Sequence, residues 1–312
     1  MHSRLDGPPR ILAAVDIGSN TVKMTVAQRG DDGSLAEIHH DAETVRLGAG
    51  IAPRGELDPA RAERAIATLK RFADTARAFG AEGLIGVATE AIRHASDGAT
   101  FLDRAQRETG WKLNVISGAD EATLTFEGLR KIVSGDANAL IADIGGGSTE
   151  FIWTKHGSLS EARSLPIGSG RLTDKWLKGD PPTTAEYTAC LESINESLAA
   201  ESGLLPQSAE KTDRLVISGG TGTYLGALIG RSEHIDQEAL QSAVSLLTQI
   251  PSGDVAHQLA IPLERARVLP AGAAVVSVLQ ERIAPTTIAI TESGLRRGLL
   301  AREFNRHSEP MS

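Results

Sequence analysis

The chain has 312 residues, of which 41% are hydrophobic and 23% charged, and its formal net charge is −8. This composition fits a globular protein large enough for two domains, and the acidic balance argues against general nucleic-acid binding, whose affinity comes largely from neutralised phosphates. The single cysteine, Cys190, excludes an intramolecular disulfide, and no apolar run is long enough to span a bilayer or to direct export. We therefore expect a cytoplasmic protein that contacts neither nucleic acid nor membrane.

The first predicted element is an apolar strand that runs into the string DIGSNT at residues 16–21. Glycine and the small polar residues Ser19, Asn20 and Thr21 allow a tight turn, after which a second strand begins. That strand reaches a turn signal at residues 31–33, which favours a further strand. The chain therefore opens with a predicted meander of strands.

The segment 41–51 is strand-like and contains Arg46, which either faces a ligand or is a solvated strand residue. A helix follows, since Asp58 is a good N-cap, Pro59 suits the first helical position, and the apolar periodicity ends at Gly80. This helix is predicted to be scaffold.

Residues 83–89 predict a buried strand, and Arg93 follows its carboxyl end, where ligands bind in open α/β sheets. A helix over 99–109 and a strand over 111–116 lead to a turn and another helix, which begins near Glu121. An acidic residue in a first helical turn usually complements the helix dipole. The place of Glu121 at a strand-to-helix turn also predicts that it lies where the chain crosses between two halves.

The stretch 139–151, ALIADIGGGSTEF, predicts a hairpin between two strands with three consecutive glycines at its turn. Such a turn can direct its amide hydrogens at an anion. The flanking carboxylates of Asp143 and Glu150 would repel a bare phosphate, but they suit a divalent cation bound beside it. The pattern therefore indicates a metal–phosphate site, and a glycine-rich hairpin without a ligand is the alternative.

The stretches at 13–26 and 139–153 follow one plan, in which an apolar strand ends in Asp-Ile-Gly and a second strand begins after small polar residues. The alignment pairs Asp16 with Asp143, Gly18 with Gly145, Thr21 with Ser148 and Lys23 with Glu150. We interpret the repeat as two related lobes, each with a phosphate loop facing one cleft.

In the second half, a Gly-Ser-Gly turn within 162–176 precedes a helix that carries Arg171 and Lys175, an arrangement suited to anion binding. Thr183 opens a capped helix, and residues 214–226 predict a strand followed by a glycine-rich turn that contacts phosphate or nucleotide. The remaining predicted elements are helices over 236–250, 271–283 and 294–304 and a strand over 286–291.

Several strings in a fixed order support a family resemblance. They are DIGSNT at 16–21, RLGAGI at 46–51, ATEAIR at 88–93, SGADEA at 117–122, DIGGGSTE at 143–150, LPIGSGRLT at 165–173, SGGT at 218–221 and SGLRRGLL at 293–300. With these strings the chain resembles the exopolyphosphatase and guanosine pentaphosphate phosphohydrolase family, a branch of the actin-like ATPase fold, over about residues 11–300.

The resemblance implies an α/β fold with two actin-like (ribonuclease H-like) lobes and the active site in the cleft between them. We expect the first lobe at 1–123 and the second at 124–296, with the C-terminal helix of about 297–312 packing back on the first. A homodimer is a further expectation from the family.

By resemblance, Glu121 would position and deprotonate the attacking water. Asp143 and Glu150 would assist as catalytic residues by binding Mg²⁺, with Mn²⁺ as an alternative. The expected phosphate-binding residues are Ser19, Asn20, Thr21, Arg93, Gly145, Gly146, Gly147 and Ser148.

The implied activity is release of terminal orthophosphate from inorganic polyphosphate or guanosine pentaphosphate. A kinase of the same fold and a regulatory protein that binds guanosine tetraphosphate or pentaphosphate with little turnover are the alternatives. Three departures from the family pattern, Asp97, Gly170 and Arg267, put the substrate preference in question.

Overall fold

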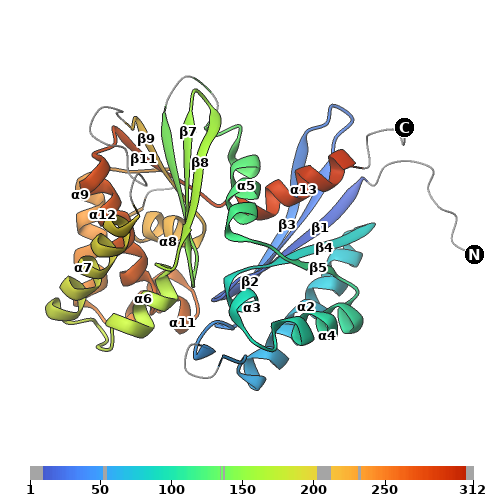
Figure 1. Cartoon of the computed structure of the whole chain (residues 1–312), viewed down its shortest axis with the longest axis horizontal. Coiled ribbons are helices and arrows are strands. Elements are labelled where there is room, and N and C mark those ends of the chain that lie inside the picture. The colour runs from blue at the N-terminus through green and yellow to red at the C-terminus, as the bar shows by residue number, and fades with distance from the viewer. Residues whose placement is uncertain are drawn as a thin grey trace, which may run out of the picture.

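The computed structural model describes residues 10–51, 55–133, 135, 138–201, 212–230 and 233–306, and these form two sheets with helices around them (Figure 1). The strands of the first sheet are β1 (Ile11–Ile17), β2 (Thr21–Arg29), β3 (Leu35–Thr44), β4 (Gly83–Ala88) and β5 (Lys112–Val115). Those of the second are β6 (Ala139–Ile144), β7 (Thr149–Lys155), β8 (Ser158–Leu165), β9 (Arg214–Ser218), β10 (His234–Ile235) and β11 (Thr287–Thr291).

The helices alternate with these strands along the chain. They are α2 (Pro59–Ala78), α3 (Glu90–His94), α4 (Gly98–Thr109), α5 (Gly118–Leu129), α6 (Ser169–Trp176), α7 (Thr184–Ala200), α8 (Gly220–Leu228), α9 (Gln237–Gln249), α10 (Ser252–Leu259), α11 (Leu263–Ala266), α12 (Leu269–Ile283) and α13 (Leu295–Arg306). Within the described residues, no helix combines the length and hydrophobicity needed to cross a membrane.

The two sheets repeat one topology. The first has the order β3-β2-β1-β4-β5, and the second has β8-β7-β6-β9-β11 with β10 added at its edge. In each, the first three strands are antiparallel and the next two run parallel to the first. This repeat confirms the expected fold class: an α/β protein of two actin-like lobes.

Each sheet buries both faces, because alternate residues of its central strand point to opposite sides. In β1, Val15 packs toward α2 and α4, while Ala14 packs toward α13. In β6, Leu140 packs into a core with α7, α9 and α12, while Ile141 packs toward α5. Helices α5 and α13 therefore cover the two sheet faces that look toward each other (Figure 1).

These two inner helices cross at a pair of glycines. A Cβ added to Gly128 of α5 would lie 2.9 Å from the backbone nitrogen of Gly298 of α13, and a Cβ at Gly298 would overlap the carbonyl oxygen of Leu124. Since only glycine leaves room for backbone to meet backbone here, the crossing depends on both residues. Helix α13 comes from the far end of the chain, yet Leu300 and Phe304 pack on the first sheet.

The cap signals place several helices correctly. Asp58 accepts a hydrogen bond from the Arg61 amide at 3.0 Å, and Thr183 and Glu186 form a complete capping box at the start of α7. Three expectations differ. The strand over 41–51 ends at Thr44, the glycine-rich turn after β9 enters α8 directly at Gly220, and the short elements β10, α10 and α11 are additional.

Candidate active site

The two glycine hairpins have the same geometry. Asp16 pairs with Lys23 across β1 and β2, and Asp143 pairs with Glu150 across β6 and β7. The turns close with equivalent bonds, from Gly18 N to Thr21 O at 3.2 Å and from Gly145 N to Ser148 O at 3.0 Å. Each second strand shifts register ten residues after its aspartate, at Val26/Ala27 and at Trp153/Thr154. The predicted alignment of the two copies is confirmed in register and in hydrogen bonding.

The start of α6 orients the second glycine loop by holding its carbonyl oxygens. The bonds run from Ser169 N to Gly145 O at 2.9 Å, from Arg171 N to Gly146 O at 2.9 Å and from Gly168 N to Gly147 O at 3.2 Å. Across a trans peptide, the carbonyl of one residue and the amide of the next point in opposite directions. The amides of Gly146, Gly147 and Ser148 therefore point away from α6, as an anion-binding loop requires.

The segment after β3 holds the first loop in the same way. Gly48 N donates to Ser19 O at 2.7 Å, and the amides of Val45 and Arg46 donate to Asn20 O at 3.0 and 2.8 Å. Arg46 adopts a left-handed backbone with φ 55°, which a non-glycine residue rarely takes without support from its surroundings. Each lobe thus fixes its own loop with the segment that follows its third strand.

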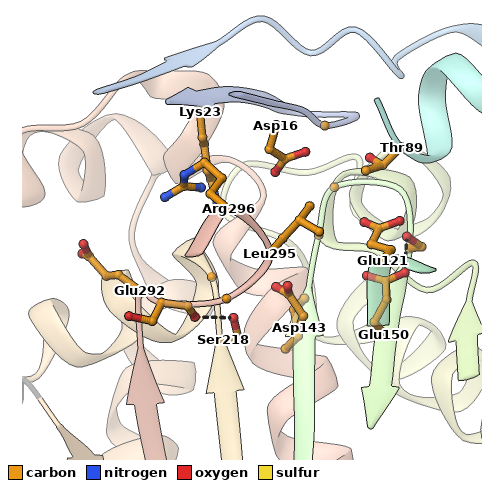
Figure 2. Close-up of a pocket in the computed structure, with 18 of the residues that line it drawn as sticks. Asp16, Lys23, Thr89, Glu121, Asp143, Glu150, Ser218, Glu292, Leu295 and Arg296 are labelled. Carbon is orange, nitrogen blue, oxygen red and sulfur yellow. Dashed lines mark hydrogen bonds between the residues drawn. The ribbon is translucent and has the colours of Figure 1, made fainter. Parts of the chain in front are cut away.

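Both loops line one narrow pocket of about 70 Å³ between the sheets. Its wall includes Asp16, Ser19 and Lys23 from the first lobe and Asp143, Gly146, Gly147 and Glu150 from the second, together with Glu121 and Arg296. Figure 2 shows the Asp16 and Asp143 side chains reaching into this pocket from opposite sides, with Glu121 and Glu150 beside each other. The two aspartate turns therefore share one crevice.

Helix α5 places Glu121 in the pocket. Ser117 and Asp120 form a capping box that fixes the first turn of this helix, so Glu121 leaves the turn toward the cleft. Its side chain is buried, and Oε2 has no hydrogen-bond partner among the described residues, although Arg93 Nη1 lies 3.7 Å away. Burial and the neighbouring carboxylates, Glu150 foremost, raise the pKa of Glu121 well above its usual value.

Glu150 is almost fully buried and accepts two hydroxyl hydrogen bonds, from Ser148 at 2.8 Å and from Ser164 at 2.7 Å. Burial, reinforced by the charge of Asp143, raises the pKa of Glu150 to about 8. Asp143 Oδ2 accepts a hydrogen bond from Thr125 Oγ1 at 3.2 Å. The pair is therefore held in place by hydroxyl donors, which orient the carboxylates without neutralising them.

Asp16 and Lys23 also line the pocket, although the sequence analysis predicted no role in the site for either residue. Burial raises the pKa of Asp16 to about 6 against the opposing effect of Lys23, and Asp16 Oδ1 has no hydrogen-bond partner among the described residues. Burial, together with Arg296 and Arg265, lowers the pKa of Lys23 to about 8. The alignment of Asp16 with Asp143 is the sequence signal that could have identified this aspartate as a site residue.

The other predicted phosphate ligands lie at or behind the loops. Ser19 lines both this pocket and an adjoining larger groove, and Asn20 lines the groove alone. The Thr21 hydroxyl and the Asn20 amide nitrogen are buried without a hydrogen-bond partner in the described structure. Arg93 does not line either pocket, since its guanidinium donates to Ile116 O at 2.6 Å beside Glu121.

The donor set fits a divalent cation. Four carboxylates, those of Asp16, Glu121, Asp143 and Glu150, line a single pocket. Burial and neighbouring carboxylates raise the pKa of three of them, Asp16, Glu121 and Glu150, and the free Oδ1 of Asp16 is available to a cation. Carboxylate oxygens are the ligands that Mg²⁺ prefers. The described residues contain no ready-made cluster of three or more metal-ligating side chains, so substrate oxygens and water would have to complete the coordination shell.

The three departures lie around the pocket rather than in it. Asp97 accepts a hydrogen bond from Leu57 N at 3.0 Å, and Arg267 donates to Gly179 O at 2.5 Å and to Lys178 O at 2.8 Å. Both therefore stabilise loops of their own lobes. A Cβ at Gly170 would lie 3.0 Å from Gly146 O, so glycine at this position lets α6 approach the loop closely.

The chain is similar in sequence to known proteins. Exopolyphosphatase 1 of Mycobacterium leprae is 29% identical over 308 residues, covering 96% of this chain and 91% of its own. The guanosine-5'-triphosphate,3'-diphosphate pyrophosphatase of Aeromonas hydrophila is 27% identical over 298 residues, which is 93% of this chain and 58% of that protein. Relatives of both names are thus similar to the chain.

The chain is also similar to solved structures. The crystal structure of the Aquifex aeolicus Ppx/GppA family member superposes with a TM-score of 0.78 at 29% identity, covering 97% of this chain and 100% of that one. An exopolyphosphatase from Cytophaga hutchinsonii has the same fold, with a TM-score of 0.86 at 21% identity over 95% of this chain and 98% of its own. The model of the Ppx/GppA phosphatase family matches residues 25–307, and the chain therefore belongs to the Ppx/GppA phosphatase family.

Proposed function

We propose that the chain is a cytoplasmic hydrolase that releases terminal orthophosphate from inorganic polyphosphate, from guanosine pentaphosphate, or from both. The observation that carries the proposal is the meeting of two oriented glycine loops and the carboxylates of Glu121, Asp143 and Glu150 in one pocket. Loops of this kind bind phosphate oxygens, and a phosphoanhydride is a substrate with several of them in a row.

In the proposed reaction, the loop amides and Ser148 hold the terminal phosphate, and Glu121 holds the attacking water. The water oxygen bonds to phosphorus, its proton passes to the Glu121 carboxylate, and the bridging phosphorus–oxygen bond breaks. The electron pair of that bond leaves on the penultimate phosphate. The raised pKa of Glu121 favours this role, because it makes the ionised carboxylate a stronger base.

Asp143 and Glu150 would hold a Mg²⁺ ion together with water and substrate oxygens, and the ion would supply charge neutralisation for the phosphate oxygens. Lys23 and Arg296 line the same pocket opposite the second loop and would face the phosphates behind the reacting one. Cations that lie beside the carboxylates suit a substrate whose negative charge extends beyond its reacting group.

The test is phosphate release from long polyphosphate, short polyphosphate and guanosine pentaphosphate, with and without magnesium. Glu121→Gln should lower the rate by about two or more orders of magnitude, because it removes the base and leaves the loops intact. Glu127→Gln is the matched control, since Glu127 lies on the same helix, pairs with Arg302 at 3.1 Å and lines neither the catalytic pocket nor the adjoining groove. Its rate should equal that of wild type.

Equal rates for wild type and Glu121→Gln would overturn the proposed chemistry. Transfer of labelled phosphate from ATP to a small acceptor, without release to water, would identify a kinase of this fold instead. Tight binding of guanosine pentaphosphate without turnover in magnesium would identify a regulatory binding protein.

A further inference from the structure

A second cavity adjoins the catalytic pocket on the other side of the loops. It has a volume of about 940 Å³, and it shares Ser19, Gly146 and Gly147 with the catalytic pocket. The contact between the two glycine loops thus forms the partition between the two spaces. Glu90, from the short helix α3, lines this cavity at the partition.

The Glu90 carboxylate lies between the loops, in surroundings suited to an oxyanion. Ser19 Oγ donates to Glu90 Oε2 at 2.9 Å, and the Arg171 guanidinium forms an ion pair with Oε1. A Cβ added to Gly147 would overlap Oε2, so the carboxylate rests directly against the second loop. The Glu90 side chain is 8% exposed, whereas its partner Arg171 is 43% exposed to the cavity.

Arg171 itself is fixed on the second loop. Its backbone nitrogen donates to Gly146 O at 2.9 Å, and its side-chain Nε donates to Gly147 O at 3.1 Å. Its Nη2 is directed across the cleft to Glu90 Oε1. A hydroxyl from one loop and an arginine anchored to the other therefore converge on a single negatively charged group.

We propose that this is a binding subsite for a phosphate-class oxyanion, occupied in this structure by the Glu90 carboxylate acting as an internal competitor. The inference rests on the proposed phosphate chemistry of the loops and adds the residues of a further subsite. An incoming phosphate accepts the same donations from Ser19 and Arg171, and Glu90 turns into the larger cavity, which has room for it.

Displacement also loosens the two lobes. Arg46, anchored on the first loop, crosses the cleft to Asp174 of α6 at 2.5 Å, and Arg171 crosses in the opposite direction to Glu90 of α3. An oxyanion that takes Arg171 from Glu90 breaks one of these two cross-cleft ion pairs. Binding at the subsite is therefore coupled to the separation of the lobes.

The probe is inorganic orthophosphate, with binding measured by isothermal titration calorimetry in the absence of turnover. Glu90→Gln should bind it about tenfold more tightly than wild type, because Arg171 is released from a charged competitor. Glu63→Gln is the matched control, since it removes the same charge from an exposed pair with Arg104 on the outside of the first lobe. Its affinity should equal that of wild type.

The Arg171→Gln background separates displacement from general electrostatics. If Glu90 competes for Arg171, the gain from Glu90→Gln disappears when both residues are changed; if Glu90 merely repels anions at a distance, the gain persists and the proposal is overturned. Unchanged or weaker affinity in a folded Glu90→Gln protein also overturns it.

Should Glu90→Gln fail to fold, Glu90→Asp is the replacement variant. It keeps the charge but withdraws it from Ser19 and Arg171, so affinity should rise by a smaller factor, and no rise counts against the subsite. Since orthophosphate binding needs no catalysis, a protein without hydrolase activity can still pass this test.

Discussion

At the scale of single residues, the site is a group of buried like charges that the fold holds together. Asp16 and Asp143 come from different sheets, and Glu121 comes from the helix between them. Burial and mutual repulsion raise the pKa values of Asp16, Glu121 and Glu150 in the metal-free protein. When ionised, these groups therefore lower the free energy of unfolding, and a bound cation would offset their mutual repulsion.

This arrangement predicts a pH-dependent stability. The pKa of Glu150 rises from 4.5 to about 8 on folding, so its contribution to stability is complete below 4.5 and is lost as the pH rises through 8. In EDTA, Glu150→Gln should raise the free energy of unfolding at pH 8.5 by about 1–3 kcal/mol and change it little at pH 4. Urea denaturation at both pH values measures this.

Added magnesium should make the wild type more stable than Glu150→Gln at pH 8.5, because only the wild type keeps the carboxylates of both Asp143 and Glu150 to bind the ion. The matched control is Glu161→Gln, at a partly exposed ion pair with Arg163. A Glu150→Gln protein that is less stable than wild type at pH 8.5 in EDTA would contradict the assignment.

The sequence identified Asp143 and Glu150 because they flank a glycine run within one local stretch. It offered less for Asp16 and Lys23, whose importance depends on two distant hairpins meeting across a cleft. Glu90 lies within the ATEAIR string, but nothing in that string distinguishes it as a site residue. Its contacts with Ser19 and Arg171 join segments 71 and 81 residues away.

At the scale of elements, the crossing of α5 and α13 holds the inner faces of the two sheets together. The backbone contact at Gly128 and Gly298 leaves no space for a side chain. Gly298→Ala should therefore lower the free energy of unfolding by about 1–3 kcal/mol, the usual cost of overpacking a close contact. Thermal and urea denaturation measure the loss.

The control is Gly253→Ala in α10, where a Cβ would meet nothing within 4 Å. Alanine favours the helical state over glycine, so this variant should be unchanged or more stable by up to about 1 kcal/mol. Similar losses in both variants would show that helix glycines as such, rather than the crossing, determine the effect.

Elements with end signals were predictable from the sequence, and elements defined by tertiary contacts were not. Asp58 and the Thr183 capping box mark helices through local hydrogen bonds that any context preserves. The segment after β3 was different, because Arg46 leaves the sheet in a left-handed conformation only to bond the first loop. Short α10 and α11 begin after Pro251 and Pro262, and neither has a side-chain cap that would mark it in the sequence.

At the scale of the molecule, the two lobes contact each other through few charged pairs across the cleft. The Arg46–Asp174 pair is 2.5 Å long, but its side chains remain 22% and 46% exposed. A double-mutant cycle of Arg46→Gln and Asp174→Asn should give a coupling of about 0.5–1 kcal/mol in the free energy of unfolding, as for other partly exposed pairs.

The coupling should also fall as salt is raised toward 1 M, where screening acts over about 3 Å. The exposed Arg64–Glu43 pair, at 2.6 Å within the first lobe, is the comparison and should behave alike. A coupling several times larger, or one insensitive to salt, would contradict this prediction. It would mean that the Arg46–Asp174 pair contributes strongly to holding the two lobes together.

The repeated hairpins place an aspartate and its cross-strand partner at matching positions, yet the partner is a lysine in one copy and a glutamate in the other. Two identical hairpins would bind a symmetric ligand equally well in either orientation. The exchange of Lys23 for Glu150 removes this equivalence, because one hairpin brings a cation to the crevice and the other brings a second carboxylate. A linear polyanion that binds there would meet different charges at the two hairpins, so one of its two directions of entry would be preferred.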